Sequence, residues 1–84
     1  MKTLTMYSKH NCAHCNSALR FLTQAEIPFT EIKIDEDDAA RNFLIGEGHR
    51  SVPQFYLEQE HLISGGWTGL QKLGAEKLIA LLTE

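Results

Sequence analysis

The chain has 84 residues, of which 43% are hydrophobic and 23% charged, a composition typical of one small globular domain. Eight basic against eleven acidic residues give a net charge of −3, which argues against a nucleic-acid or anionic-membrane partner. No apolar run is long enough for a transmembrane helix. The N-terminal stretch before the first predicted helix is too short and too polar to be a signal peptide. We therefore expect a single soluble domain over residues 1–84, located in the cytoplasm.

Two strand–helix pairs are predicted in the first half of the chain. Residues 3–8 favour a first strand, and apolar residues then recur at helical spacing from Cys12 to Ala25. Asn11, immediately before this helix, is a candidate N-cap. The alternating residues 29–34 predict a second strand, and an acidic turn suits the N-terminus of a second helix over residues 38–45.

The second half of the chain predicts a hairpin followed by a helix. Residues 54–57 read as a third strand that starts behind a proline, and a short turn separates it from a fourth strand at residues 61–63. A final helix begins at Thr68 and is interrupted near Gly74, or a separate last helix begins at Glu76. The element order is βαβαββα, which predicts an α/β fold with a small mixed sheet covered by helices on both faces.

Cys12 and Cys15 are the only cysteines of the chain and are spaced as Cys-Ala-His-Cys on the first turn of the predicted helix. They share one helix face and can form a disulfide. Because this disulfide would close a loop of only a few residues, it would constrain the unfolded chain little and add little to stability. The positive end of the helix dipole favours the thiolate of Cys12, and Lys9 and His14 add positive charge beside it. A CxxC at a strand-to-helix junction predicts a redox pair, in which Cys12 attacks a substrate disulfide and Cys15 resolves the mixed disulfide.

Two other interpretations of the cysteine pair stay open at this point. The thiols can be buried core groups, or they can form half of a zinc site completed by histidines. The chain has no second CxxC, so we predict no metal site. His10 and His49 are expected to be solvated surface groups, and His61 a strand residue.

Two further segments each allow a structural and a functional interpretation. Pro53 precedes an apolar strand, where proline is tolerated only at the start or on an edge, and base rates favour a trans peptide bond. Gly65-Gly66 is either a turn between strand and helix or a stretch of backbone that a peptide-like ligand can approach closely.

Taken together, the ordered motifs of the chain resemble the glutaredoxin family of the thioredoxin superfamily. The motifs, which extend over nearly the full chain, are Tyr7-Ser8-Lys9, Cys12-Ala13-His14-Cys15, Ser51-Val52-Pro53-Gln54 and Gly65-Gly66. The resemblance implies a thioredoxin fold, with a four-stranded mixed sheet flanked by helices. It also implies that the bond before Pro53 is cis and that this proline lies against the active-site disulfide.

The same resemblance implies a groove for glutathione as co-substrate and no tightly bound cofactor. Lys9 would lie near the glutathione carboxylates, Val52 would pair with the peptide backbone, and Gly66 and the residues after it would bind the γ-glutamyl end. The implied substrate-binding residues are Lys9, His14, Val52, Pro53, Gly65, Gly66, Trp67 and Thr68.

The chain departs from the family pattern in two places. The usual CPYC is replaced by Cys-Ala-His-Cys, and the acidic residue that usually follows Gly-Gly is absent from the stretch Trp67-Thr68-Gly69-Leu70. That stretch, together with Gly48-His49-Arg50, looks like the glutaredoxin-like redoxins that donate electrons to ribonucleotide reductase. Those redoxins are reduced by thioredoxin reductase, whereas Gly65-Gly66 and Pro53-Gln54 look more like true glutaredoxins.

We therefore expect a monomeric thiol-disulfide oxidoreductase that takes electrons from glutathione or thioredoxin reductase. Its acceptors would be disulfide-containing proteins such as ribonucleotide reductase. Some glutaredoxins without the CPYC proline hold an iron–sulfur cluster in a dimer, and an inactive scaffold is a further alternative. Trp67 is expected to pack beside the glycines, with partner docking as the alternative role.

Overall fold

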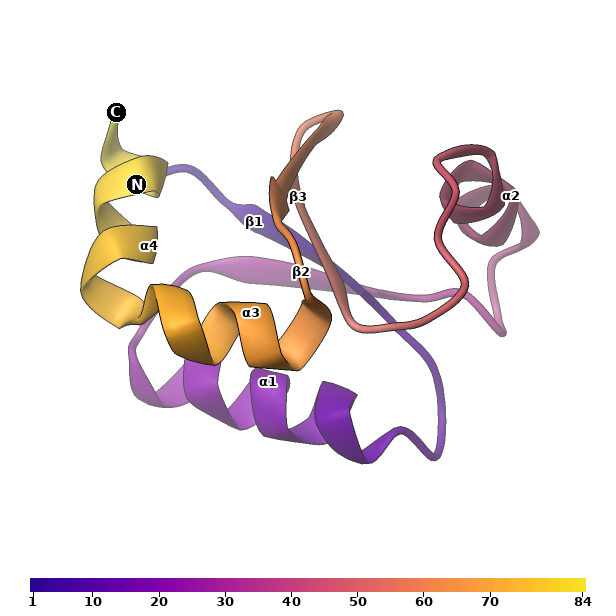
Figure 1. The fold of residues 1–84 in the computed structure, drawn as a ribbon, viewed down its shortest axis with the longest axis horizontal. Helices are drawn as coiled ribbons and strands as arrows, with labels where there is room; N and C mark the ends of the chain where they lie inside the picture. Colours follow the sequence, from indigo (N-terminus) through magenta and orange to yellow (C-terminus); the bar gives the residue numbers. More distant parts are fainter.

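The computed structural model describes all 84 residues and contains four strands and four helices (Figure 1). In chain order they are β1 Leu4–Ser8, α1 Ala13–Gln24, β2 Phe29–Lys33, α2 Asp38–Gly46, β3 Gln54–Leu57, β4 Glu60–Ile63, α3 Gly66–Leu73 and α4 Ala75–Thr83. The predicted α/β thioredoxin-like fold is confirmed, and the final helical region consists of two helices. None of the helices has the length and hydropathy that a membrane span requires.

The four strands form one mixed sheet in the order β2-β1-β3-β4. β1 runs parallel to β2 and antiparallel to β3, and β3 and β4 form an antiparallel hairpin. Leu4, Met6 and Ser8 alternate with half-buried residues along β1, so these three side chains share one fully buried face. Met6 is paired with Phe55 of β3, and this pair lies near the centre of the core.

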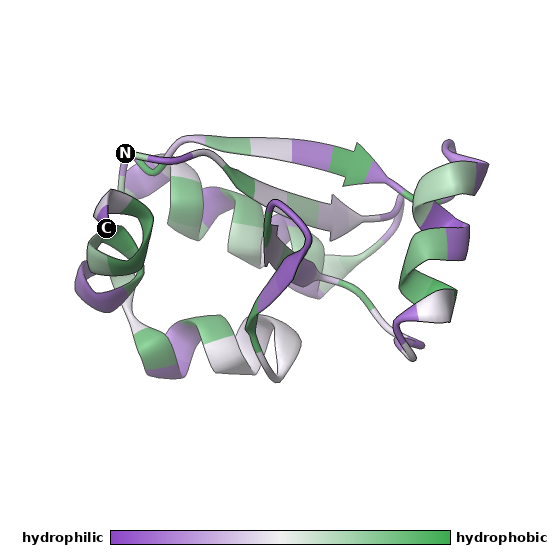
Figure 2. Ribbon diagram, turned by 90° about the horizontal axis from the view of Figure 1, so that it is seen from above, coloured by the Kyte–Doolittle hydropathy of each residue, from purple (hydrophilic) through white to green (hydrophobic).

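Helices α1, α3 and α4 cover one face of the sheet and bury an aliphatic core. In Figure 1, α1 and α3 run close to one another beside the strands, and residues of the two helices are in contact. Hydrophobic residues of α4 face the rest of the molecule, and hydrophilic residues lie on its outer side (Figure 2). The core consists of Leu4, Met6, Ala18, Leu22, Ile27, Phe55, Ile63, Leu70, Leu78 and Leu82.

Helix α2 stands apart from the other three helices (Figure 1) and contacts the opposite face of the sheet through an aromatic cluster. The Phe43 ring lies 5.8 Å from the ring of Tyr7 and 5.3 Å from that of Tyr56, centroid to centroid. Asp37 caps the helix, because its side chain accepts a hydrogen bond of 3.0 Å from the Ala40 amide. This acidic start was predicted from the sequence.

The structure corrects the predicted start of α1 and resolves the end of the chain. Asn11 is not the N-cap; it has a left-handed φ of 55°, and Cys12 caps the helix through its own sulfur. The interruption near Gly74 is confirmed, and the separate last helix begins at Ala75 rather than Glu76. Gly74 has a φ of 81°, which breaks the helical path between α3 and α4.

Candidate active site

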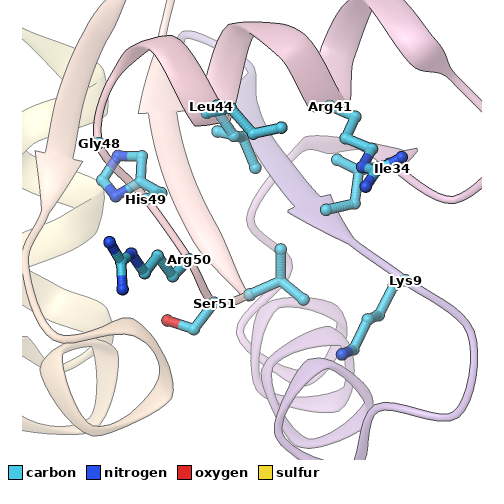
Figure 3. A pocket seen from close by; sticks show the side chains of 10 residues that line it. Lys9, Ile34, Arg41, Leu44, Gly48, His49, Arg50 and Ser51 are labelled. Atoms are coloured by element: carbon cyan, nitrogen blue, oxygen red, sulfur yellow. The ribbon is translucent and has the colours of Figure 1, made fainter.

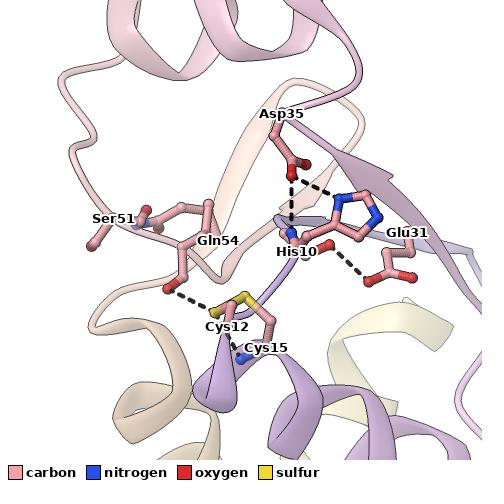
Figure 4. The surroundings of a disulfide bond; sticks show 9 residues. His10, Cys12, Cys15, Glu31, Asp35, Ser51 and Gln54 are labelled. Atoms are coloured by element: carbon pink, nitrogen blue, oxygen red, sulfur yellow. Dashed lines mark hydrogen bonds and ion pairs between the residues drawn. A yellow bond between two sulfur atoms is a disulfide. The ribbon is translucent and has the colours of Figure 1, made fainter.

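Cys12 and Cys15 are joined by a disulfide at the N-terminus of α1 (Figure 4), with their Cα atoms 5.2 Å apart. Cys12 lies just before the first helical residue, and its Sγ accepts a hydrogen bond of 3.2 Å from the Cys15 amide. A sulfur that accepts from the free amides of a helix N-terminus is stabilised as an anion once the disulfide is reduced. Cys12 is 8% exposed and Cys15 only 2%, so Cys12 is the more accessible sulfur of the pair.

The loop before β3 lies directly against the disulfide. The Val52–Pro53 peptide bond is cis, as the family resemblance implied, and the Pro53 side chain is buried. The Val52 carbonyl oxygen lies 3.9 Å from Cys12 Sγ. Since a disulfide sulfur carries no proton, this approach is a contact in the oxidised protein, and a Cys12 thiol is placed to donate to the same oxygen after reduction.

Gln54 holds this loop in place, a role that its position in the Ser51-Val52-Pro53-Gln54 motif did not predict. The Gln54 side chain is 6% exposed; its Nε2 donates to the Ser51 carbonyl at 2.9 Å. Its Oε1 can only accept, so the 3.1 Å contact to His61 Nε2 requires the proton on that nitrogen. The amide thus joins the turn before Pro53 to β4. A polar residue within an otherwise buried strand was the sequence signal for this role.

A second hydrogen-bonded chain lies on the same face of the sheet. The buried Tyr56 hydroxyl donates its only hydrogen to Glu47 Oε1 at 3.0 Å. The same hydroxyl lies 2.7 Å from His49 Nε2, so this nitrogen must be the donor of the second hydrogen bond. Burial and the neighbouring Glu47 carboxylate raise the pKa of Tyr56 to about 12. Partial burial, together with the charge of His49, lowers the pKa of His61. The prediction that His49 is a solvated surface group was therefore wrong, while His61 does lie in a strand.

The other predicted surface histidine, His10, is exposed but makes ion pairs. Its Nδ1 lies 2.7 Å from Asp35 Oδ2 (Figure 4). Its Nε2 lies 3.1 Å from Glu36 Oε2. The hydrogen bond from His10 lowers the pKa of Asp35. Beneath this cluster, the buried Ser8 hydroxyl donates to Glu31 at 2.7 Å.

A groove of about 300 Å³ runs from the loop before β3 to the start of α3, and we call it the proline–glycine groove. It collects all of the predicted binding residues except Lys9, namely His14, Val52, Pro53, Gly65, Gly66, Trp67 and Thr68. Gly66 has a φ of 57°, and a Cβ there would come within 3.2 Å of the Pro53 carbonyl oxygen. The glycine thus allows α3 to start close to the proline loop. None of the residues that line the groove is acidic.

Lys9 lies on the other side of Val52, in a separate pocket of about 470 Å³. Arg41 and Arg50 line the same pocket, and neither was predicted to belong to a site. The spacing of Arg41 with Leu44 and Ile45 on one face of α2 was the available signal, because residues three and four apart are helix neighbours.

Trp67 packs mainly against the protein itself. Its ring makes an edge-to-face contact with Phe21 of α1 at 5.9 Å between centroids, and it packs against the core. This favours the packing interpretation of Trp67, and its half-buried ring also forms part of the groove wall.

Comparisons with known proteins agree with this geometry. The family model described as Glutaredoxin matches residues 4–62. Glutaredoxin 3 of Escherichia coli strain K12 is 32% identical over 76 residues, which cover 89% of each chain. The glutaredoxin-like protein NrdH of Lactococcus lactis subsp. cremoris is 40% identical over 50 residues, 60% of this chain and 69% of that one. The crystal structure of a buckwheat glutaredoxin–glutathione complex matches with a TM-score of 0.77 at 26% identity, over 95% of this chain and 76% of the other.

Proposed function

The chain belongs to the glutaredoxin family of thiol-disulfide oxidoreductases, and we propose that it reduces disulfides of partner proteins through Cys12 and Cys15. The observation that carries this proposal is the position of Cys12 Sγ. It caps α1, accepts from the Cys15 amide, and contacts the Val52 carbonyl where the proline–glycine groove meets the loop. A nucleophile, a resolving thiol and a surface for the substrate are thus adjacent.

The proposed exchange has two steps, starting from the reduced protein. The Cys12 thiolate attacks one sulfur of the partner disulfide; the bond between the two partner sulfurs breaks, and the other sulfur leaves as a thiolate that takes up a proton. The Cys15 thiolate then attacks Cys12 Sγ, and the second partner sulfur leaves in the same way. Two electrons and two protons pass to the partner, and the Cys12–Cys15 disulfide of the present structure is the product.

For the reductant that restores the dithiol, we favour thioredoxin reductase over glutathione. The amino group of a γ-glutamyl residue is a cation, and the residues that line the proline–glycine groove include no carboxylate to pair with it. Glutathione, the reductant expected from the wider family, is the second candidate.

The proposed acceptor is a protein disulfide, and ribonucleotide reductase is the acceptor that the sequence resemblance suggests. The likeness to proteins named NrdH and the segment Trp67-Thr68-Gly69 support this choice. The proposed setting is the cytoplasm, where thiols are kept reduced and a redox-active pair can be recycled.

Single-cysteine variants test the proposal. Cys12→Ser should abolish reduction of insulin disulfides, while Cys15→Ser should accumulate a mixed disulfide at Cys12 that mass spectrometry detects. Full activity of Cys12→Ser would contradict the proposal. The reductant is tested by mixing the oxidised protein with glutathione or with thioredoxin reductase and NADPH; fast reduction by glutathione alone would contradict our preference for the enzyme.

A further inference from the structure

The pocket that contains Lys9 combines an apolar floor with a cationic rim, and we call it the cationic pocket (Figure 3). Its floor consists of Ile34, Leu44, Ile45 and Val52. Lys9, Arg41 and Arg50 line its rim from three different segments: the turn after β1, helix α2, and the loop before β3. In Figure 3, Lys9 and Arg41 lie on one side of the pocket and Arg50 on the other.

The cations of this rim have no internal partners. Both ion pairs of the protein involve His10, so Lys9, Arg41 and Arg50 pair with no carboxylate. Asp38, one helical turn before Arg41, makes no ion pair with it, and no acidic residue lines the pocket. A chain with a net charge of −3 thus places three of its eight basic residues around one opening. Clustered charge of this kind attracts an anionic partner.

The apolar part of the pocket is open to solvent as well. Ile45 is 58% exposed, which makes it one of two large hydrophobic residues with a high exposure in this protein, the other being Met1. An exposed apolar side chain within a cationic rim fits a ligand that carries both carboxylates and a hydrophobic group. Glutathione offers carboxylates but no hydrophobic side chain, so the floor of the pocket would gain nothing from it.

Val52 connects this pocket to the reacting sulfur. It lines both the cationic pocket and the proline–glycine groove, and its carbonyl oxygen lies 3.9 Å from Cys12 Sγ. A peptide segment that is bonded to Cys12 in a mixed disulfide must therefore pass Val52. Where the segment continues past Val52 towards Lys9, it lies over the cationic pocket. The volume of about 470 Å³ lies within the usual range of binding sites.

We propose that the cationic pocket selects the protein partner by binding the segment next to its reacting cysteine, and that this segment carries acidic side chains and one large apolar side chain. The proposal rests on the disulfide exchange proposed above, and it assigns the specificity to Arg41, Arg50 and Ile45. The apolar side chain lies on the floor beside Ile45, and the carboxylates pair with the two arginines and Lys9.

The test uses the pre-reduced protein and three synthetic peptides of equal length, each closed by one intramolecular disulfide. The first peptide carries two glutamates and a phenylalanine beside the disulfide; the second has glutamine for glutamate, and the third has serine for phenylalanine. Hydroxyethyl disulfide serves as a small uncharged substrate. The quantity measured is the second-order rate constant for oxidation of the protein, by alkylation quench and mass spectrometry.

At low ionic strength the acidic peptide should react roughly threefold to tenfold faster than its glutamine counterpart, because two or three exposed ion pairs contribute a modest amount each. This ratio should fall towards one in 1 M salt, where such pairs are screened. The double variant Arg41→Gln/Arg50→Gln should bring the ratio of the acidic to the glutamine peptide close to one. Ile45→Ser should reduce the rate advantage of the phenylalanine peptide over the serine peptide. Arg20→Gln, an exposed arginine of α1 outside both pockets, is the matched control and should keep every ratio.

The outcomes separate this proposal from the proposed function. A wild-type protein that fails to react even with hydroxyethyl disulfide would contradict the disulfide exchange itself. A protein that reacts with hydroxyethyl disulfide but treats the acidic and glutamine peptides alike would overturn the cationic pocket alone. If the arginine double variant slows reduction by glutathione and leaves the peptide ratio unchanged, the pocket serves glutathione and the proposal is likewise overturned.

Discussion

On one face of the sheet, α1, α3 and α4 bury aliphatic side chains around Met6 and Phe55, with no polar side chain in the cluster. On the other face, α2 meets the sheet through aromatic rings, and Tyr56 is hydrogen-bonded to Glu47 and His49. The first face is close-packed and tolerates little change in volume. The second face opens into the cationic pocket, so its residues contribute to recognition as well as stability. Substitutions on the aliphatic face should therefore affect folding more than those near α2.

The two faces should differ most in how a Gly→Ala substitution changes the free energy of unfolding. At Gly69 of α3, an added Cβ would overlap the Ser64 carbonyl oxygen, which is backbone and cannot rotate away. Gly69→Ala should therefore lower the free energy of unfolding by about 3 kcal/mol or more, as severe overpacking does. At Gly46 of α2, nothing lies within 4 Å of the corresponding Cβ, so Gly46→Ala should be neutral or stabilise by up to about 1 kcal/mol. Urea denaturation measures both; a mild effect at Gly69 would contradict the close packing of α3.

A matched pair of leucines compares the two faces with the same chemistry. Leu22 of α1 is fully buried in the aliphatic core, whereas Leu44 of α2 is 3% exposed and lines the floor of the cationic pocket. Leu22→Ala leaves a closed cavity and should cost about 3–5 kcal/mol, while Leu44→Ala should cost about 2 kcal/mol because the site can be filled by water or by neighbouring side chains. Equal losses of unfolding free energy would show that α2 packs as tightly as α1.

The aromatic face should be visible in the titration of the two tyrosines. The pKa of Tyr56 is raised to about 12, and burial followed by the Asp37 charge raises that of Tyr7. Ultraviolet absorbance of the folded protein should therefore show no tyrosinate with a midpoint at pH 10, whereas the urea-unfolded chain should titrate there. Since the folded state holds these protons longer, stability should fall as the pH rises above 10. A normal midpoint in the folded protein would contradict the buried hydrogen bond of Tyr56.

The smallest expected effect is the contribution of His61, on this face, to the pH dependence of the free energy of unfolding. Partial burial first, and then the charge of His49, lower its pKa in the folded protein. Below about pH 6.5 the unfolded chain therefore binds more protons at this residue, and stability decreases as the pH falls through the lowered value. His61→Gln, which keeps a donor for Gln54, should reduce this slope in denaturation curves between pH 7 and 5. An unchanged slope would assign the dependence to another group.

The fold followed from local patterns in the sequence, because each element carries its own periodicity and capping signal. The alternation of β1 and the acidic start of α2 depend only on neighbouring residues. Asn11 was mistaken for the N-cap because its side chain suits that position, while the sulfur of Cys12 was not counted as an acceptor.

Much of the candidate site depended on contacts between distant segments and was harder to predict. The residues of the proline–glycine groove came from the family resemblance, and so did the cis bond before Pro53. The pocket residues Arg41 and Arg50 were not predicted, because their side chains lie near Lys9 only once α2 has packed on the sheet. The hydrogen bond from His49 to Tyr56 was missed for the same reason.

The central claim, that Cys12 is the attacking thiol of a redox pair, has a direct test. The fully reduced protein is treated at pH 7 with less than one equivalent of iodoacetamide, and the modified cysteine is identified by peptide mass mapping. The more exposed Cys12, which accepts from the Cys15 amide, should carry nearly all of the label and react faster than free cysteine. Label on Cys15, or equal label on both at the rate of free cysteine, would contradict the account.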